Sequence, residues 1–278
     1  MQIYSKNAVY QKFEVLKSNR NKRKKHNEFI IEGVRNINEA VKNNWRLSSF
    51  IYPQNRKLSG WATDLLNDIK TDTNYALADN LMAELSDKAD TSELMAVVAM
   101  QKKEKLSLSA NPVLVLSDRP SNKGNLGTLL RSCDALGVDG LIITGHGVDI
   151  YDPDVIGAST GSFFKLPFLH LSDNKDIDAY IADLRRQFTD FKVIGSAEDS
   201  ETPIYDLDLR RPVLIMMGNE KDGLNRYLQG LCDAVAEIPM NADRAASSLN
   251  VSCAAAVVLY EVVRQRSQLV THSHQLKA

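Results

Sequence analysis

The sequence predicts an α/β protein of two domains, in which the C-terminal domain is built on a parallel sheet and the smaller N-terminal domain is also α/β. Nearly continuous apolar runs, such as Val113–Leu116 and Leu141–Ile143, alternate with helical patterns through the second half. Strands of this kind are typical of a parallel sheet that helices cover on both faces. A polar stretch at 101–111, rich in lysine and serine, interrupts the pattern. We therefore expect domains at 1–105 and 106–278.

Composition excludes several classes of protein. The formal net charge is -1, so overall charge indicates no particular partner. The three cysteines, Cys133, Cys232 and Cys253, lie in apolar runs and show no metal-ligand spacing, which predicts reduced, buried thiols. Neither a signal peptide nor an apolar run of transmembrane length is evident. We expect a cytoplasmic protein with no metal and no membrane contact.

The N-terminal domain is expected to alternate strands and helices. Phe29–Ile31 is a short apolar run that ends at Gly33, and Pro53 stops the next such run. Between them, Val34, Ile37 and Val41 recur at helical spacing and predict one buried face. We expect strands at 29–31, 47–52 and 94–100, and helices at 34–43, 61–69 and 80–85.

The C-terminal domain follows a regular strand and helix alternation. Gly137 and Gly145 mark the ends of a helix and a strand, as glycine commonly does. We expect strands at 112–116, 141–144, 191–195, 212–217 and 234–238, and helices at 127–136, 177–188 and 251–268.

Polar loops follow three of these strands. Ligands in open parallel sheets bind beyond the carboxyl ends of the strands, so the loops at 117–127, 218–224 and 247–252 are candidate ligand sites. The first is a glycine-containing turn that enters a helix, which suits an anion, yet it is neither a Walker loop nor GxGxxG. A plain turn capped by Asn125 is an equal alternative. Arg131 is either a surface charge or a group that reaches back to a phosphate.

The other two loops also allow a purely structural interpretation. Gly218 and Gly223 permit close approach of the backbone to a ligand, with Glu220 between them, although a solvated turn is the simpler interpretation. Ser248 and Asn250 precede an apolar helix that we expect to be buried, and they could serve only as helix caps. Polar groups at the start of a buried helix must be satisfied by the protein or by a ligand.

Together the three loops closely resemble the motifs of the SpoU (TrmH-like) family of RNA ribose 2′-O-methyltransferases, in the SPOUT superfamily. The resemblance extends over about 113–266, and 29–33 resembles the start of the family's substrate-binding domain, which is ribosomal-protein-like. The matching residues are Asn125-Leu126-Gly127 with Arg131 and Asp134–Val138, Gly218-Asn219-Glu220 with Gly223-Leu224, and Ile238-Pro239-Met240 with Ser248–Ser252.

The resemblance implies a fold, a cofactor and an assembly. It implies a deep C-terminal trefoil knot, which no periodicity indicates and which the rule against knotted chains disfavours. It further implies a homodimer and S-adenosylmethionine as cofactor. The cofactor-binding residues on this resemblance are Gly218, Asn219, Ile238, Met240 and Leu249.

The resemblance also assigns catalytic roles for methyl transfer to a ribose 2′-oxygen. Arg131 would activate the hydroxyl, and since guanidinium is effectively never deprotonated, holding a phosphate and stabilising alkoxide charge is a physically sound form of that role. Asn125, Ser248 and Asn250 would orient the ribose and Arg131, and Glu220 would fix Arg131 or accept a proton.

A basic run in the N-terminal domain is the candidate RNA-binding segment. It is either a solvated charged face or a set of phosphate contacts, and its place in the expected substrate domain favours RNA. The residues are Arg20, Lys22, Arg23, Lys24 and Lys25. The 2′-hydroxyl excludes DNA as substrate. We expect structured RNA, with ribosomal RNA favoured over transfer RNA.

Three other functions remain as alternatives: a tRNA methyltransferase, a non-catalytic RNA-binding protein on the same fold, and a Rossmann-type oxidoreductase. The retained polar motif residues disfavour the second. The missing early glycine fingerprint disfavours the third.

Overall fold

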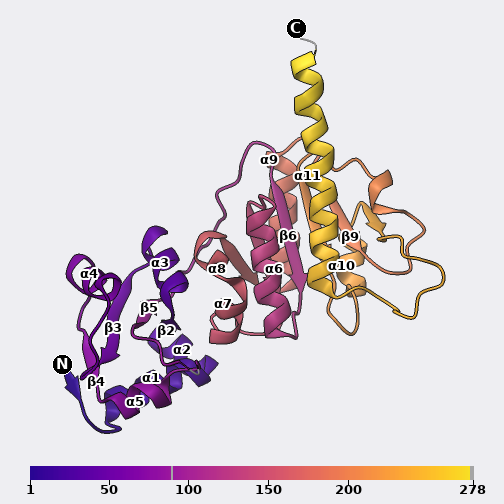
Figure 1. Cartoon of the computed structure of the whole chain (residues 1–278). Helices are drawn as coiled ribbons and strands as arrows, with labels where there is room; N and C mark the ends of the chain where they lie inside the picture. The colour runs from indigo at the N-terminus through magenta and orange to yellow at the C-terminus, as the bar shows by residue number, and fades with distance from the viewer. Residues whose placement is uncertain (89, 276–278) are drawn as a thin grey trace. The chain divides into compact units, whose positions relative to one another are not determined.

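The computed structural model describes residues 1–88 and 90–275, which form two compact units (Figure 1). Unit 1 comprises Met1–Lys102 and Asp149–Lys165, and unit 2 comprises Lys103–Val148 and the chain from Leu166 onward. A segment from the second half of the chain thus belongs to unit 1. No pattern in the sequence indicates this excursion.

Unit 1 contains a mixed sheet of five strands in the order β1-β4-β3-β5-β2. Its first three strands in that order run parallel, whereas β5 is antiparallel to both β3 and β2. The strands are β1 (Gln2–Ile3), β2 (Glu28–Glu32), β3 (Leu47–Pro53), β4 (Tyr75–Leu77) and β5 (Met95–Ala99). The strands expected at 29–31, 47–52 and 94–100 are confirmed as β2, β3 and β5.

Helices cover the sheet of unit 1. Its helices from the N-terminal part of the chain are α1 (Ala8–Ser18), α2 (Arg20–His26), α3 (Val34–Lys42), α4 (Gly60–Asp68) and α5 (Asp79–Leu85). The last three confirm the expected helices, whereas α1 and α2 were not expected. Residues from α1 and α5, including Phe13, Leu16 and Met82, pack with Ile30 and Val97 of the sheet in one apolar core. One expectation is wrong: Val34, the first residue of α3, is 53% exposed, because Ile37 and Ala40 form the buried face.

The excursion Asp149–Lys165 is bound into unit 1 by polar and aromatic contacts. It carries α7 (Pro153–Ser159) and α8 (Ser162–Lys165). Phe163 and Phe164 pack against Phe29 and Trp45, and the Trp45 indole N–H donates to the carbonyl oxygen of Phe164 at 2.8 Å. The excursion therefore supplies part of the interior of unit 1.

Unit 2 is built on a six-stranded sheet in the order β11-β9-β10-β6-β7-β8. Every pairing in it is parallel, which confirms the expected parallel-sheet α/β fold. The strands are β6 (Val113–Asp118), β7 (Gly140–Thr144), β8 (Phe168–Leu171), β9 (Lys192–Ser196), β10 (Val213–Met217) and β11 (Ala234–Ala236). Of these, β8 was not expected.

Both faces of this sheet are covered. Leu114, Leu116 and Val193 belong to a core shared with α9 (Asn174–Gln187) and α10 (Arg226–Leu231). Because side chains alternate along a strand, the residues between them face the other side, where α6 (Lys123–Ala135) and α11 (Val251–Gln275) lie next to each other (Figure 1). A 3-10 turn, Ile204–Asp206, follows β9.

Three details of unit 2 differ from expectation. Helix α6 begins at Lys123 and is capped by Asn122, whose side chain accepts from the N–H of Asn125, so Asn125 is not the cap. Helix α11 continues to Gln275, and it is not buried all round, because Val257 and Tyr260 are 43% and 62% exposed. Of the three thiols, only Cys133 is buried. Cys232 is half-buried and Cys253 is exposed on the same open side of α11.

Candidate active site

The three motif loops meet at the carboxyl edge of the unit 2 sheet. They follow β6, β10 and β11, and β9, β10 and β6 are direct neighbours. A cavity of about 600 Å³ lies among them and is lined by residues of all three loops. All five expected cofactor residues line it, together with four of the five expected catalytic residues, Asn125, Glu220, Ser248 and Asn250.

Gly218 shapes the floor of this cavity. A Cβ atom on Gly218 would lie 2.3 Å from the backbone of Gly223 and of Leu224, closer than non-bonded atoms can approach. The turn that follows is closed by two backbone hydrogen bonds between Asn219 and Gly223, of 2.9 and 3.0 Å. Gly223 itself has φ +65°, which glycine adopts at no steric cost. Glycine is thus sterically required at position 218 and conformationally favoured at position 223.

Asp118, which the motif analysis did not single out, joins three strand-end loops. Its carboxylate is 1% exposed at the end of β6. It accepts from Nε and Nη2 of Arg119, from the Thr144 hydroxyl at the end of β7, and from the backbone and side-chain N–H groups of Asn225 after β10, at 3.0 to 3.2 Å. The Asn219 side chain donates to the carbonyl oxygen of Arg119 at 2.6 Å. A buried carboxylate with this many donors fixes the loops relative to one another.

The Glu220 carboxylate is held by donors from the first loop. It accepts from the N–H and hydroxyl of Ser121 at 3.0 and 2.7 Å, and from the N–H of Asn122 and the side-chain amide of Asn125, both at 3.2 Å. Burial disfavours the charged form, but the bonds from Ser121 and Asn125 outweigh it and lower the pKa of Glu220. Glu220 is therefore ionised at neutral pH, and its lowered pKa makes it a poor proton acceptor.

Asn250 connects the third loop to the first. Its Nδ2 donates to Oδ1 of Asn125 at 2.9 Å, and its own Oδ1 accepts from the N–H and hydroxyl of Ser252 at 3.0 and 2.6 Å. The bond from the Ser252 N–H is a helix-capping bond, so Asn250 caps α11 and also contacts the opposite wall of the cavity. Ser248 lines the cavity, and its hydroxyl has no hydrogen-bond partner among the described residues.

Arg131 is placed differently from the other expected catalytic residues. It is exposed on α6, does not line the cavity, and makes no hydrogen bond or ion pair with any residue that the structure describes. The expected contact with Glu220 is wrong, because the four donors of the first loop already occupy that carboxylate. Its guanidinium is open to a ligand from outside.

The expected RNA-binding residues lie on α2 in unit 1, and one of them was misassigned. Lys22, Lys24 and Lys25 are exposed and Arg20 is half-buried. Arg23 is 1% exposed. It donates from Nε to Asp149 at 2.8 Å and lies 3.4 Å from Asp152, both in the excursion. Arg23 is thus an internal anchor and cannot contact an RNA phosphate from this position.

Charged residues that the three motifs do not include also line the cavity. Glu198 and Asp199 follow β9, and Lys221 and Asp222 lie in the β10 turn. In the sequence, the only indication that these residues line a site is that they follow the end of a strand. Many solvated loops share this feature.

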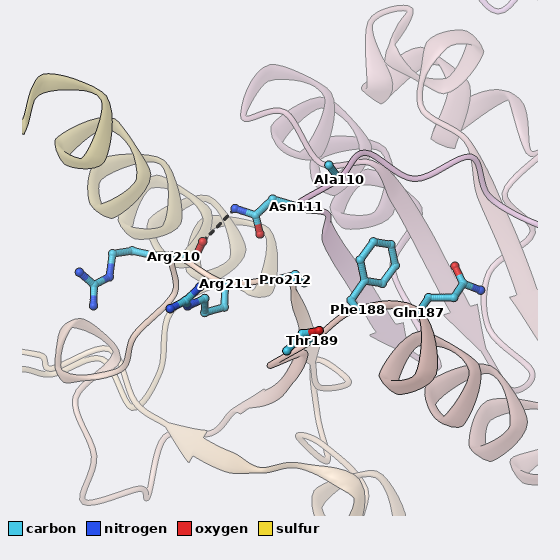
Figure 2. Close-up of a pocket in the computed structure, with 8 residues that line it drawn as sticks. All are labelled: Ala110, Asn111, Gln187, Phe188, Thr189, Arg210, Arg211 and Pro212. Carbon is cyan, nitrogen blue, oxygen red and sulfur yellow. Dashed lines mark hydrogen bonds between the residues drawn. The ribbon is translucent and has the colours of Figure 1, made fainter. Parts of the chain in front are cut away.

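A second cavity of about 600 Å³ lies at the opposite edge of the same sheet (Figure 2). It is formed where the chain enters β6 and β10, and Asn111 donates to the carbonyl oxygen of Arg210 at 2.9 Å beside it. Among the described residues that line it, none belongs to the three motifs.

Metal-binding clusters and membrane-spanning helices are both absent from the part of the chain that the structure describes. No group of three or more histidine, cysteine, aspartate or glutamate side chains there could hold a metal ion. None of its helices is long and apolar enough to cross a bilayer.

Comparison with known proteins agrees with this geometry. Residues 112–260 match the model of the SpoU rRNA Methylase family. The chain belongs to the SpoU rRNA methylase family. Residues 7–96 match the SpoU L30e-like domain, so both halves of the chain correspond to parts of SpoU proteins.

The chain is similar to named relatives over most of its length. The 23S rRNA (uridine(2479)-2'-O)-methyltransferase of Streptomyces viridochromogenes is 39% identical over 95% of this chain and 92% of the relative. A 23S rRNA (guanosine(2553)-2'-O)-methyltransferase of Bacillus subtilis is 25% identical over 86% of this chain and 90% of the relative. The crystal structure of the SpoU methyltransferase AviRb from S. viridochromogenes with AdoMet has a TM-score of 0.88 at 38% identity, covering 94% of this chain and 98% of that one.

Proposed function

We propose that this protein transfers a methyl group from S-adenosylmethionine to a ribose 2′-hydroxyl of ribosomal RNA. The observation that carries the proposal is the cavity at the carboxyl edge of the unit 2 sheet, to which three loops distant in sequence contribute the motif residues of one family. The relatives named above are 23S rRNA 2'-O-methyltransferases, which supports the choice of ribosomal RNA.

The residues of the cavity fit S-adenosylmethionine. A volume of about 600 Å³ is in the usual range for a small-molecule site. The absence of a side chain at Gly218 lets the backbone of Gly223 and Leu224 pack directly against it, which sets the shape of the cavity wall. In this proposal Gly218, Asn219, Ile238, Met240 and Leu249 hold the cofactor. When bound, the cofactor supplies a methyl group on a sulfonium sulfur, which is an excellent leaving group.

The protein must then position and activate the alcohol. Ser248 and the linked amides of Asn125 and Asn250 orient the ribose, because their polar atoms line the cavity next to one another. Arg131 binds the phosphate beside the target ribose and stabilises negative charge developing on the 2′-oxygen. Glu220 fixes the first loop through Ser121 and Asn125 and does not take the proton.

Unit 1 is the proposed RNA-binding unit. The exposed Lys22, Lys24 and Lys25, with Arg20, would contact phosphates without regard to sequence. In this scheme 1–105 is the substrate-binding domain and 106–278 is the catalytic domain. The excursion Asp149–Lys165 lies within the second range of sequence but packs in unit 1. A knotted C-terminal chain path and a cytoplasmic location belong to the same proposal.

A homodimer is also part of the proposal. Cys253, Val257 and Tyr260 recur along α11 at helical spacing and are exposed, which leaves an apolar strip without a partner in the monomer. Such strips on soluble proteins commonly mark contacts between protein surfaces.

The test is transfer of labelled methyl from S-adenosylmethionine to purified RNAs, followed by mapping of 2′-O-methyl groups. We expect one modified nucleotide in unmodified 23S rRNA, and none when that nucleotide carries a 2′-deoxyribose. Methylation of transfer RNA instead would overturn the substrate assignment. Methylation of a base would overturn the reaction.

A further inference from the structure

The loop after β9 presents two carboxylates to the cavity. Ser196 to Asp199 line it, and the loop is fixed to β11 by the Ala197 N–H, which donates to Ala236 at 3.0 Å, and by the Ser200 hydroxyl, which donates to Val235 at 2.7 Å. Glu198 and Asp199 are exposed. Neither side chain has a hydrogen bond or ion pair with another described residue, so no such residue pairs directly with their charge.

The charges around the cavity are unbalanced. The lining carboxylates are Glu198, Asp199, Glu220 and Asp222, and the single lysine or arginine among the lining residues is Lys221. Glu220 is already bonded to the first loop. Glu198 and Asp199 therefore contribute negative potential inside a concave site, where low-dielectric walls strengthen it.

We propose that Glu198 and Asp199 determine specificity for the charge of the cofactor, raising affinity for the cationic methyl donor relative to its neutral demethylated product. This inference rests on the proposed use of S-adenosylmethionine. In the reaction the carbon–sulfur bond to the methyl group breaks with its electron pair going to sulfur, a carbon–oxygen bond to the ribose forms, and the hydroxyl proton passes to solvent water. The sulfonium becomes a neutral thioether, and the two molecules are otherwise identical. The attraction between the carboxylates and the sulfonium thus ends when the methyl group leaves, which weakens product binding.

The distinguishing experiment is titration calorimetry of S-adenosylmethionine and S-adenosylhomocysteine against the full-length protein and the double variant Glu198→Gln/Asp199→Asn. The amides keep hydrogen-bond acceptors in place but remove the charge. We expect the Kd for S-adenosylmethionine to rise about threefold to tenfold, as for two exposed charges, and the Kd for S-adenosylhomocysteine to stay within about twofold. The difference should shrink at high salt.

Glu201→Gln is the matched control, since Glu201 is an exposed carboxylate of the same loop that does not line the cavity. It should change neither Kd by more than about twofold, as expected for a charge outside the site. Equal weakening of both ligands in the double variant would mean that the carboxylates bind the shared ribose, and would overturn the inference, as would unchanged affinities. If the wild-type protein bound neither ligand, the proposed cofactor itself would be wrong and this inference with it.

Discussion

The side chain of Asn250 donates a hydrogen bond to that of Asn125 at 2.9 Å, across 125 positions of sequence. Asn250 simultaneously caps α11 through the N–H of Ser252, and Asn125 donates to Glu220. One chain of hydrogen bonds thus links all three motif loops. Asn250, for which a capping role was one of two interpretations from sequence, caps α11 and also contacts the first loop.

Asn250→Ala should therefore lower both stability and turnover. Loss of the cap costs about 1 kcal/mol of unfolding free energy. Loss of the bond to Asn125 should reduce kcat at least about tenfold, because misplaced positioning groups are costly. Urea unfolding and single-turnover methyl transfer measure the two effects. Ser252→Ala, which leaves the capping oxygen of Asn250 in place, is the control, and equal kcat losses in both variants would argue against a positioning role.

Arg131→Ala should abolish methyl transfer while cofactor binding survives. Arg131 lies outside the cavity and has no bond to any described residue, so its removal should leave the binding walls intact. We expect kcat to fall at least about 100-fold, as for the loss of an oxyanion-stabilising donor. Calorimetry of S-adenosylmethionine gives the second readout. Near-wild-type turnover would remove Arg131 from the mechanism.

Asp118→Ala should strongly destabilise unit 2. It removes a buried carboxylate and leaves the hydroxyl of Thr144 and the amide of Asn225 without their acceptor. We expect a loss of about 2–4 kcal/mol in unfolding free energy. Asp208→Ala is the control, because Asp208 pairs with Arg210 on the surface at 2.7 Å and such pairs contribute about 1 kcal/mol or less. Equal effects of the two substitutions would contradict a structural role for Asp118.

The basic residues of α2 should separate into two classes. Arg23→Ala breaks a buried ion pair with Asp149 and should cost about 3–5 kcal/mol. Changing Lys22, Lys24 and Lys25 together to alanine should leave stability within about 0.5 kcal/mol, as is usual for surface substitutions. The triple variant should instead flatten the salt dependence of RNA binding, by about 0.7–0.9 in slope for each lost phosphate contact. An unchanged slope would exclude this helix from RNA binding.

Glu220 should stabilise the protein in a defined pH range. Its pKa is lower in the folded protein than the ordinary 4.5, so the folded state binds fewer protons than the unfolded one. Its contribution is therefore fully present above pH 4.5 and is lost as the pH falls through the folded pKa. Glu220→Gln should cost about 1–2 kcal/mol at neutral pH, as for bonds to a charged group. Unfolding at several pH values tests this, and a difference that grew towards low pH would have the wrong sign.

Much of the unit 2 fold could be predicted from local pattern. Five of its six strands were expected, because strands buried on both faces contain continuous apolar runs, as in Leu141–Ile143. Strand β8 was missed because its residues alternate in burial, with His170 exposed and Leu169 buried. Helix α2 was missed because its seven mostly cationic residues show no apolar face. The buried side chain of this helix is that of Arg23.

The sequence by itself determined the parallel sheet and the loops that would carry chemistry. Strand-end loops of a parallel sheet fall on one edge, so Gly218, Ile238 and Ser248 could be grouped from the sequence alone. Only the tertiary structure decided which polar groups pair. Glu220 accepts hydrogen bonds from Ser121 and Asn125, and Arg23 donates to Asp149. The physical reason is that local spacing encodes which face of an element is apolar. The partners of these charged groups lie 95 to 126 positions away in the chain and are brought close only by folding.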